Sequence, residues 1–328
     1  MSRLTKRYDF TGRAGRERKV YRMTPALFMH RSTSSARIAK DETEEDFVKR
    51  LTHLKLQDKN IKEIENLEEM KALQVLYLQD NRIVSMAPLQ CCARLTNLHL
   101  SRNGIKVIEG LNVCVNLRKL FLEGNEISHV SGLENNAMLE ELNLSNQKLA
   151  NGDSLTFDET CLDILGGNLQ TLTIDGNNIK TATQFLRLAE IQIFQCRKNK
   201  LEDVGELVEL IASLSEVKKV DLSGNPACRA PKFRETLLIN CSNRLQALNG
   251  KDIDMKQRDA LIRFAQHRQQ RSERKAAAKQ QQQLHQQQQG MPKHHHQQRQ
   301  PLSNQHANNF HGSAHQQFGN GDVQGYHQ

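Results

Sequence analysis

A repeat of about 22 residues runs through most of this 328-residue chain and limits the folds that the chain can adopt. Eight segments open on an apolar residue, and the intervals between successive openings are 22, 22, 22, 22, 30, 22 and 26 residues. The opening residues are Leu51, Leu73, Leu95, Leu117, Leu139, Leu169, Ile191 and Val217. Apolar residues recur at repeat positions 1, 4, 6 and 11, and asparagine usually stands at position 9. A nearly fixed period of this length indicates a stack of similar coils.

This spacing is the leucine-rich repeat pattern, LxxLxLxxNxL, and it predicts an α/β solenoid of about eight repeats. Side chains at positions 4 and 6 share one face of a short strand, because strand side chains alternate with a period of two. Each coil buries those leucines against the next coil, and the parallel strands form the concave face. Apolar residues at positions 14, 17 and 20 are three apart, which favours short 3₁₀ or irregular turns on the convex face.

Asparagine at position 9 has a structural role in the predicted turn. Its amide and its carbonyl can each bond a buried backbone group where the chain leaves the strand. Six repeats carry this residue: Asn81, Asn103, Asn125, Asn177, Asn199 and Asn225. Lys59 and Gln147 occupy the position in the other two repeats, where we expect the turn to be formed differently.

Both ends of such a stack expose apolar side chains and need covers. Residues 43–51 predict a capping helix with Thr43 as its N-cap residue. Residues 225–253 follow the last repeat, and their leucines are expected to seal the final coil. The long fifth repeat contains an insert over residues 151–167, which predicts one α-helix on the convex face with Asp158 as its N-cap residue.

Charge divides the chain into three parts. Residues 1–40 hold 11 Lys and Arg against 2 Asp and Glu, residues 41–253 hold 25 against 31, and residues 254–328 hold 10 against 4. We predict a basic, disordered N-terminal arm, then the capped repeat domain, then a basic helix-prone segment that leads into a disordered Gln/His-rich tail. Apolar residues of the helix-prone segment are expected to dock beside the C-terminal cap: Leu261, Ile262, Phe264 and Ala265.

Several classes of protein do not fit the sequence. No apolar run reaches the ~20 residues of a membrane helix, and the N-terminus lacks the apolar core of a signal peptide. Seven scattered cysteines without a CxxC pair argue against disulfides and zinc. No GxSxG, HExxH or glycine-rich phosphate loop is present, so we expect neither catalysis nor a cofactor. The run His294–His296 lacks acidic or cysteine partners and does not indicate a metal site. We expect a monomeric protein of the cytosol or nucleus.

The residue between the two inward leucines of each strand must face the concave surface. In three consecutive repeats this residue is Tyr77, His99 or Phe121, about 5 Å apart across parallel strands. Polar residues are expected around the rings: Gln79, Glu123, Glu140, Glu141 and Asn143. Aromatic residues beside acidic ones are typical of a protein-binding surface, with the rings as anchors and the carboxylates facing basic groups. The alternative is cross-strand packing that only stiffens the sheet.

Residues 45–253 resemble the leucine-rich repeat regulators of protein phosphatase 1 that have 22-residue repeats. The resemblance lies in four segments: THLKLQDKNI (52–61), NQKLANGDSLTFDE (146–159), DLSGNPAC (221–228) and PKFRETLL (231–238). It implies binding of the phosphatase 1 catalytic subunit and a cytoskeletal or centrosomal location. The short phosphatase-docking motif, a basic residue followed by Val/Ile-x-Phe, has no clear match. The nearest segment, LIRF (261–264), lacks the basic residue, so binding would use the solenoid face.

Two classes of function remain. We favour a regulatory or targeting subunit that binds a phosphatase, or a cytoskeletal protein such as tubulin, through the concave face. The alternative is a ribonucleoprotein-type or ciliary adaptor. Its solenoid would bind another protein, and its basic tails would contact RNA or microtubules through charge.

Overall fold

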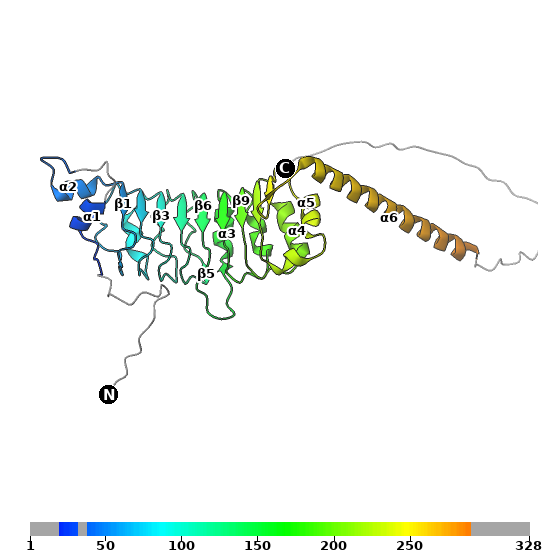
Figure 1. The fold of residues 1–328 in the computed structure, drawn as a ribbon, viewed down its shortest axis with the longest axis horizontal. Helices are drawn as coiled ribbons and strands as arrows, with labels where there is room; N and C mark the ends of the chain where they lie inside the picture. The colour runs from blue at the N-terminus through cyan, green and yellow to red at the C-terminus, as the bar shows by residue number, and fades with distance from the viewer. Residues whose placement is uncertain (1–19, 32–37, 290–328) are drawn as a thin grey trace, which may run out of the picture. The chain divides into compact units, whose positions relative to one another are not determined.

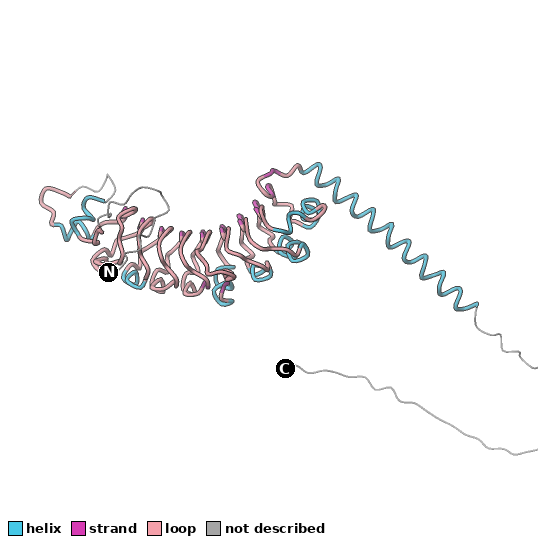
Figure 2. The backbone as a smooth tube through the Cα atoms, turned by 60° about the horizontal axis from the view of Figure 1, so that its bottom comes forward, coloured by secondary structure: helices cyan, strands magenta, loops and turns pink. Residues whose placement is uncertain are grey.

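The computed structural model of the protein describes residues 20–31 and 38–289, with side chains up to residue 283. The chain divides into two compact units, Met1–Gln270 and Arg271–Gln328, and the repeats belong to the first. Figure 1 shows the successive coils of the solenoid in chain order. In Figure 2 the strands follow the inner curve of the solenoid, and the helical turns follow the outer curve. The leucine-rich repeat solenoid predicted from the sequence is confirmed.

A sheet of ten strands forms the concave layer. Each of the eight repeats contributes one strand of three residues, and these strands pair in parallel with their neighbours. They are β1 (His53–Lys55), β2 (Val75–Tyr77), β3 (Asn97–His99), β4 (Lys119–Phe121), β6 (Glu141–Asn143), β8 (Thr171–Thr173), β9 (Ile193–Gln195) and β10 (Lys219–Asp221). The C-terminal cap adds β11 (Ala247–Leu248) and the antiparallel β12 (Lys251–Asp252).

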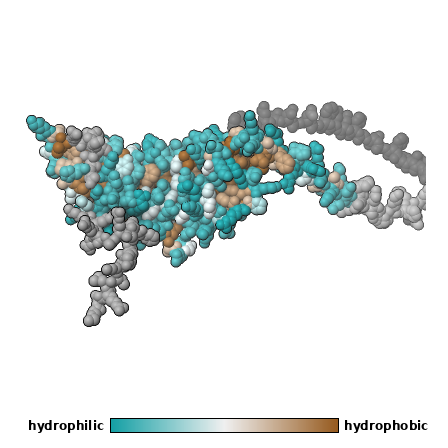
Figure 3. All heavy atoms as spheres, in the orientation of Figure 1, coloured by the Kyte–Doolittle hydropathy of each residue, from teal (hydrophilic) through white to brown (hydrophobic). Residues whose placement is uncertain are grey.

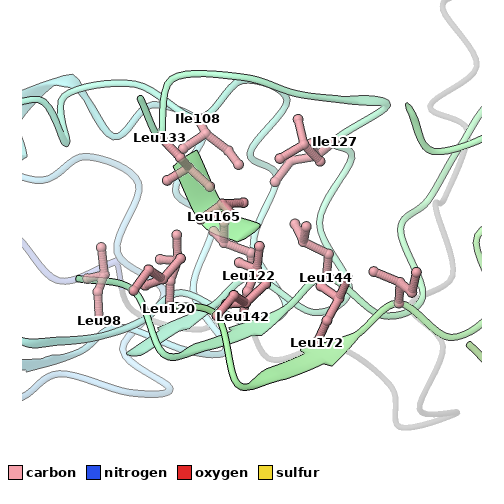
Figure 4. Close-up of a cluster of buried hydrophobic side chains, with 14 of the residues drawn as sticks. Leu98, Ile108, Leu120, Leu122, Ile127, Leu133, Leu142, Leu144, Leu165 and Leu172 are labelled. Carbon is pink, nitrogen blue, oxygen red and sulfur yellow. The ribbon is translucent and has the colours of Figure 1, made fainter. Parts of the chain in front are cut away.

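Leucines at repeat positions 4 and 6 form the core between the coils. Leu98, Leu120, Leu142 and Leu172 lie in register in β3, β4, β6 and β8, and all four are fully buried. Figure 4 shows these four side chains along the sheet, with the leucines of position 6 beside them. A three-residue strand is not stable alone, so the apolar area buried between coils, at roughly 25 cal/mol per Å², holds the stack together.

The asparagines of position 9 connect each turn to the coil before it. Asn125 is fully buried, and its amide nitrogen donates to the carbonyls of Leu100 at 3.0 Å and Leu122 at 2.8 Å. Its Oδ1 accepts from the backbone amide of Ile105 at 3.1 Å. The other five asparagines also bond to their own coil and to the preceding coil. This confirms their role in the turns.

Gln147 corrects one expectation about these turns. Its side-chain amide donates to the carbonyls of Leu122 and Leu144, and its Oε1 accepts from the amide of Ile127. The fifth turn is therefore formed as the asparagine turns are, with a longer side chain. The first turn does differ, because Lys59 has no side-chain amide to make these bonds. Its backbone amide donates to Oδ1 of Asn81 in the next coil at 3.0 Å, as the backbone amides of Gln147 and Asn177 also do toward their next coils.

The convex face holds more helix than the sequence analysis predicts. The insert forms α3 (Glu159–Gly166), and Asp158 caps it as expected by accepting from two backbone amides. Two short turns are 3₁₀ helices, η1 (Ala87–Cys91) and η2 (Thr183–Arg187). The prediction of a single convex α-helix is wrong, because the 26-residue seventh repeat contains α4 (Val204–Ser213).

A second, two-stranded parallel sheet was also not predicted. It pairs β5 (His129–Val130) with β7 (Thr156–Phe157), which belongs to the insert.

Cys92 and Cys114 are buried at matching positions of successive coils, as expected for small apolar residues. Burial raises the pKa of the Cys114 thiol to about 11.

The N-terminal end of the stack is covered by two helices. Helix α2 (Glu44–Lys49) begins after Thr43, whose side chain accepts from a backbone amide of the first turn, as predicted. Helix α1 (Pro25–Arg31) packs against α2 and β1, and its Phe28 and the preceding Met23 are fully buried. The expectation of a disordered arm is therefore wrong for residues 25–31. Residues 1–19 lie outside the described residues.

The C-terminal end is covered by η3 (Pro226–Arg229) and α5 (Phe233–Asn240). The leucines predicted to seal the last coil are buried: Leu237, Leu238, Leu245 and Leu248. Helix α6 (Met255–Gln289) follows and continues through glutamines that were expected to be disordered. Phe264 is 69% exposed, so the prediction that it docks beside the cap is wrong.

Within residues 20–31 and 38–289, no helix combines the length and apolar character needed to span a bilayer. The same residues contain no cluster of side chains suited to hold a metal ion. The run His294–His296 and the remainder of the predicted tail, from residue 290 onward, lie outside the described residues.

Candidate protein-binding surface

Three rings stack on the concave surface across β2, β3 and β4. The strand register pairs Tyr77 with His99 and His99 with Phe121. The ring centroids are 4.5 Å apart for the first pair and 4.4 Å for the second, with interplanar angles of 23° and 12°. Each of the three residues is half-buried. We call Tyr77, His99 and Phe121 the ring ladder.

The stacking decides which part of each ring a ligand can touch. His99 has a ring on either side, so both of its faces are occupied and its edge remains for solvent. Ring edges carry the positive end of the aromatic quadrupole and pair with oxygen atoms or with the face of another ring. Aromatic residues that bind nucleic-acid bases present free faces instead. His99 therefore offers a partner the edge of its ring and not a face on which a base could stack.

The imidazole of His99 is neutral near pH 7. Partial burial lowers its pKa below the ordinary value of 6.5, and the charge of Lys119 lowers it further. The carboxylate of Glu141 opposes these two effects without cancelling them. The middle of the ladder therefore carries no charge, and the three rings form one mainly apolar strip across the sheet.

Two of the acidic residues predicted beside the ladder are already paired. The Nζ of Lys119 lies 2.7 Å from a carboxylate oxygen of Glu141, and Arg118 forms an ion pair with Glu140. Glu140 and Glu141 are therefore not free to meet basic groups of a partner, contrary to the expectation. Glu123 is the one carboxylate of the three that no described residue neutralises in an ion pair.

Gln79 and Asn143 differ in how their side chains are satisfied. The Oε1 of Gln79 is buried and has no hydrogen-bond partner among the described residues. The Oδ1 of Asn143 accepts from the amide of Ser145 at 3.0 Å, so it is committed to its own coil. A buried acceptor without a donor costs about 1–3 kcal/mol. Because the chain itself covers this oxygen, the structure offers a partner no direct access to it.

Position 3 of the repeat also faces the concave surface, and the sequence analysis included it only at Glu141. Lys119 stands two residues before Phe121 in β4, and its pairing with Glu141 of β6 shields that edge of the ladder. Val75 stands two residues before Tyr77 in β2 and is almost fully buried. The two-residue period of a strand was the signal that could have identified both residues.

Solved structures with the same fold support this architecture, whereas no family model matches the chain. Internalin C2 from Listeria monocytogenes is 23% identical over 62% of this chain and 83% of that chain, with a TM-score of 0.50. A leucine-rich repeat protein from Leptospira interrogans is 22% identical over 63% of this chain and 52% of that one, with a TM-score of 0.51. The TLR13–ssRNA13 complex is 19% identical over 63% and 31%, also with a TM-score of 0.51. At these identities the likeness shows the fold alone.

Proposed function

We propose that the protein is a non-enzymatic scaffold that binds another protein through the concave face of its solenoid. The observation that carries this proposal is the ring ladder, in which Tyr77, His99 and Phe121 stay half-exposed on a rigid sheet. Rings held in place lose little conformational freedom on binding, and aromatic residues dominate the energetics of protein interfaces. Glu123 supplies a negative charge beside this apolar strip.

The partner that we propose is the catalytic subunit of protein phosphatase 1, with the chain as its regulatory or targeting subunit at the cytoskeleton or centrosome. The resemblance of residues 45–253 to regulators of that enzyme supports this choice. The sequence has no clear short docking motif, because LIRF (261–264) lacks the preceding basic residue. The folded concave surface is therefore the part of the chain left to make the contact.

The proposal is tested by calorimetric titration of the full chain with purified phosphatase 1 catalytic subunit. Truncating a buried aromatic anchor costs about 2 kcal/mol or more, so Phe121→Ala is expected to weaken binding by about thirtyfold or more. Phe264→Ala is the matched control, because it removes an exposed phenylalanine that lies outside the concave sheet. The control is expected to bind with wild-type affinity.

Two failures of this test have different meanings. If the wild-type chain does not bind the phosphatase, the choice of partner is wrong, and crosslinked capture from native tissue read by mass spectrometry then identifies the partner. If Phe121→Ala and Phe264→Ala bind the phosphatase equally well, the assignment to the concave face is wrong.

A further inference from the structure

Helix α6 is attached to the C-terminal cap by one face near its start. Arg258 is 2% exposed, and its guanidinium donates to the carbonyl of Leu238 at 2.9 Å, to Asn243 Oδ1 at 3.0 Å and to the carbonyl of Cys241. Three further residues on this side are half-buried: Leu261, Ile262 and Ala265. These contacts fix the rotation of the helix about its axis, so its opposite face is left exposed.

The exposed face of α6 is basic. At 100° per residue, Lys256, Arg263 and His267 fall within about 40° of arc. The centre of this arc is about 170° from the centre of the attached face. We call these three residues the basic stripe. All three are exposed, and no described residue forms an ion pair with their side chains. The acidic residue Asp259 lies outside the arc.

Phe264 lies about 60° around the helix axis from His267 of the basic stripe and is 69% exposed. It stacks on no other described ring, so both of its faces are free, unlike those of His99 in the ring ladder. Burial of a phenylalanine side chain is favourable, so this exposure carries a cost in the isolated chain. A free ring among unpaired cations is suited to a ligand with both negative charges and flat apolar faces.

Single-stranded nucleic acid has this combination, because its phosphates pair with cations and its unstacked bases stack on aromatic side chains. A lipid surface fits less well. Helices that lie in membranes present a broad apolar face, whereas Leu261, Ile262 and Ala265 of α6 are half-buried on its attached face. In Figure 3 the visible surface of α6 beyond its start is largely hydrophilic, and hydrophobic residues gather near α5 and the start of α6. An acidic protein would use the charges but has no need of the ring.

We propose that the exposed face of α6 binds single-stranded nucleic acid, with phosphates on the basic stripe and a base stacked on Phe264. This inference does not depend on the proposed concave-face partner, because the ring ladder and the basic stripe share no residue. It gives the chain a second binding activity, through which the scaffold would hold a nucleic acid as well as a protein.

The charge contribution is tested by fluorescence anisotropy of the full chain with a labelled oligouridylate of about 20 nucleotides at several salt concentrations. The variant Lys256→Gln, Arg263→Gln, His267→Gln is expected to reduce the slope of log K against log salt by about 1.4, because each of the two permanent charges that it removes contributes about 0.7 on a single strand. The matched control is Arg82→Gln, Arg94→Gln, His30→Gln, which removes two permanent charges and one imidazole from exposed positions elsewhere in the first unit. Glutamine preserves helix propensity, and circular dichroism checks that α6 persists.

The stacking contribution is tested by Phe264→Ala in the same assay. Loss of one stacked base is expected to weaken binding by about 5- to 100-fold while the salt slope stays unchanged. Phe121→Ala, which removes a ring from the concave face, is expected to bind the oligouridylate as the wild type does. Phe264→Ala is therefore expected to weaken binding only in the nucleic-acid assay, and Phe121→Ala only in the phosphatase assay.

Three results would overturn this inference. Equal salt slopes for the two triple variants would assign the binding to other basic segments of the chain. Wild-type affinity of Phe264→Ala would exclude base stacking. Polyglutamate or a duplex that binds as tightly as oligouridylate would assign the stripe to polyanions in general. None of these results affects the phosphatase titration, so the two proposals fail separately.

Discussion

Gln147 shows that a repeat position accepts a second residue type when the same functional group is delivered to the same backbone atoms. Both asparagine and glutamine carry an amide that can donate and accept, and Gln147 uses it on Leu122, Leu144 and Ile127 as the asparagines do on their neighbours. The pattern alone could not predict this, because the extra methylene changes the reach of the side chain. Gln147 belongs to the 30-residue repeat that opens at Leu139, and the extra length of this repeat leaves its coil free to adjust.

His99 makes the stability of the solenoid depend on pH below neutrality. Because its folded-state pKa is lowered from 6.5, the unfolded chain binds the proton more strongly than the folded chain. The stability that neutral His99 contributes is therefore complete above about pH 6.5 and is lost as the pH falls through the folded-state pKa. We expect the free energy of unfolding in urea to fall less between about pH 7.5 and pH 5.5 for His99→Phe than for the wild type. Phenylalanine keeps a ring between Tyr77 and Phe121, and an identical fall in both proteins would contradict the prediction.

At the scale of elements, the strands could be predicted from the sequence and α4 could not. Equal intervals of 22 residues bring the leucines of successive strands into register, so periodicity alone places β2, β3 and β4 side by side. In the seventh repeat, Leu207, Leu210 and Ile211 bury one face of a helix, and Asp203 caps it. The sequence analysis expected short 3₁₀ or irregular turns on the convex face, because apolar residues there are three apart, and it therefore missed the helical spacing of Leu207, Leu210 and Ile211. The four extra residues of that repeat indicated additional structure.

Of the four residues of α6 predicted to dock beside the cap, Leu261, Ile262 and Ala265 are half-buried, and only Phe264 was mispredicted, because a charged residue decides the rotation of the helix. Hydrophobic patterning assigns Phe264 to the buried side and Arg258 to solvent, whereas the structure has the reverse. The guanidinium of Arg258 bonds backbone carbonyls at the end of α5 and so brings its own side of the helix onto the cap. Patterns that count every arginine as exposed cannot detect such an anchor, because burial of a cation depends on acceptors that only the fold brings together.

Arg258→Ala tests the anchor. Hydrogen bonds from a charged donor contribute about 1.5–3 kcal/mol, and the variant removes three acceptor contacts at once. We expect backbone amides of residues 255–265 to lose protection in hydrogen exchange by about ten- to a hundredfold, while those of β1 to β4 keep theirs. Arg268→Ala, at an exposed position of the same helix, is the control. Equal exchange in the two variants would show that Arg258 does not hold α6 on the cap.

At the scale of the whole molecule, the equal length of the coils determines which residues of the candidate site lie side by side. It does not determine how the charges of the site are paired. The register of Tyr77, His99 and Phe121 is set by two equal repeat intervals, so their proximity could be predicted from the sequence. Whether the rings lie face to face, and whether Lys119 neutralises Glu141, depends on side-chain directions across neighbouring coils. Those contacts arise only when the coils are stacked, and no single repeat encodes them.

A linear stack of coils has two ends, and the elements that cap these ends prevent the chain from associating with other copies of itself. Leu237 of α5 is fully buried in the cap, while β11 and β12 cover the edge of β10. Leu237→Asp buries a charge without a partner, at a cost of about 4 kcal/mol or more, and is expected to unseat the cap.

An uncovered strand edge pairs with another chain, so we expect Leu237→Asp to associate with increasing concentration in sedimentation velocity, relative to the wild type. Asn240→Asp adds the same charge at an exposed position of α5 and is expected to sediment as the wild type does. If Leu237→Asp also sediments as the wild type at every concentration, the last coil does not need α5 to seal it. The stack would then have to be terminated by β11 and β12 alone, because β11 pairs with the edge of β10 and β12 pairs with β11.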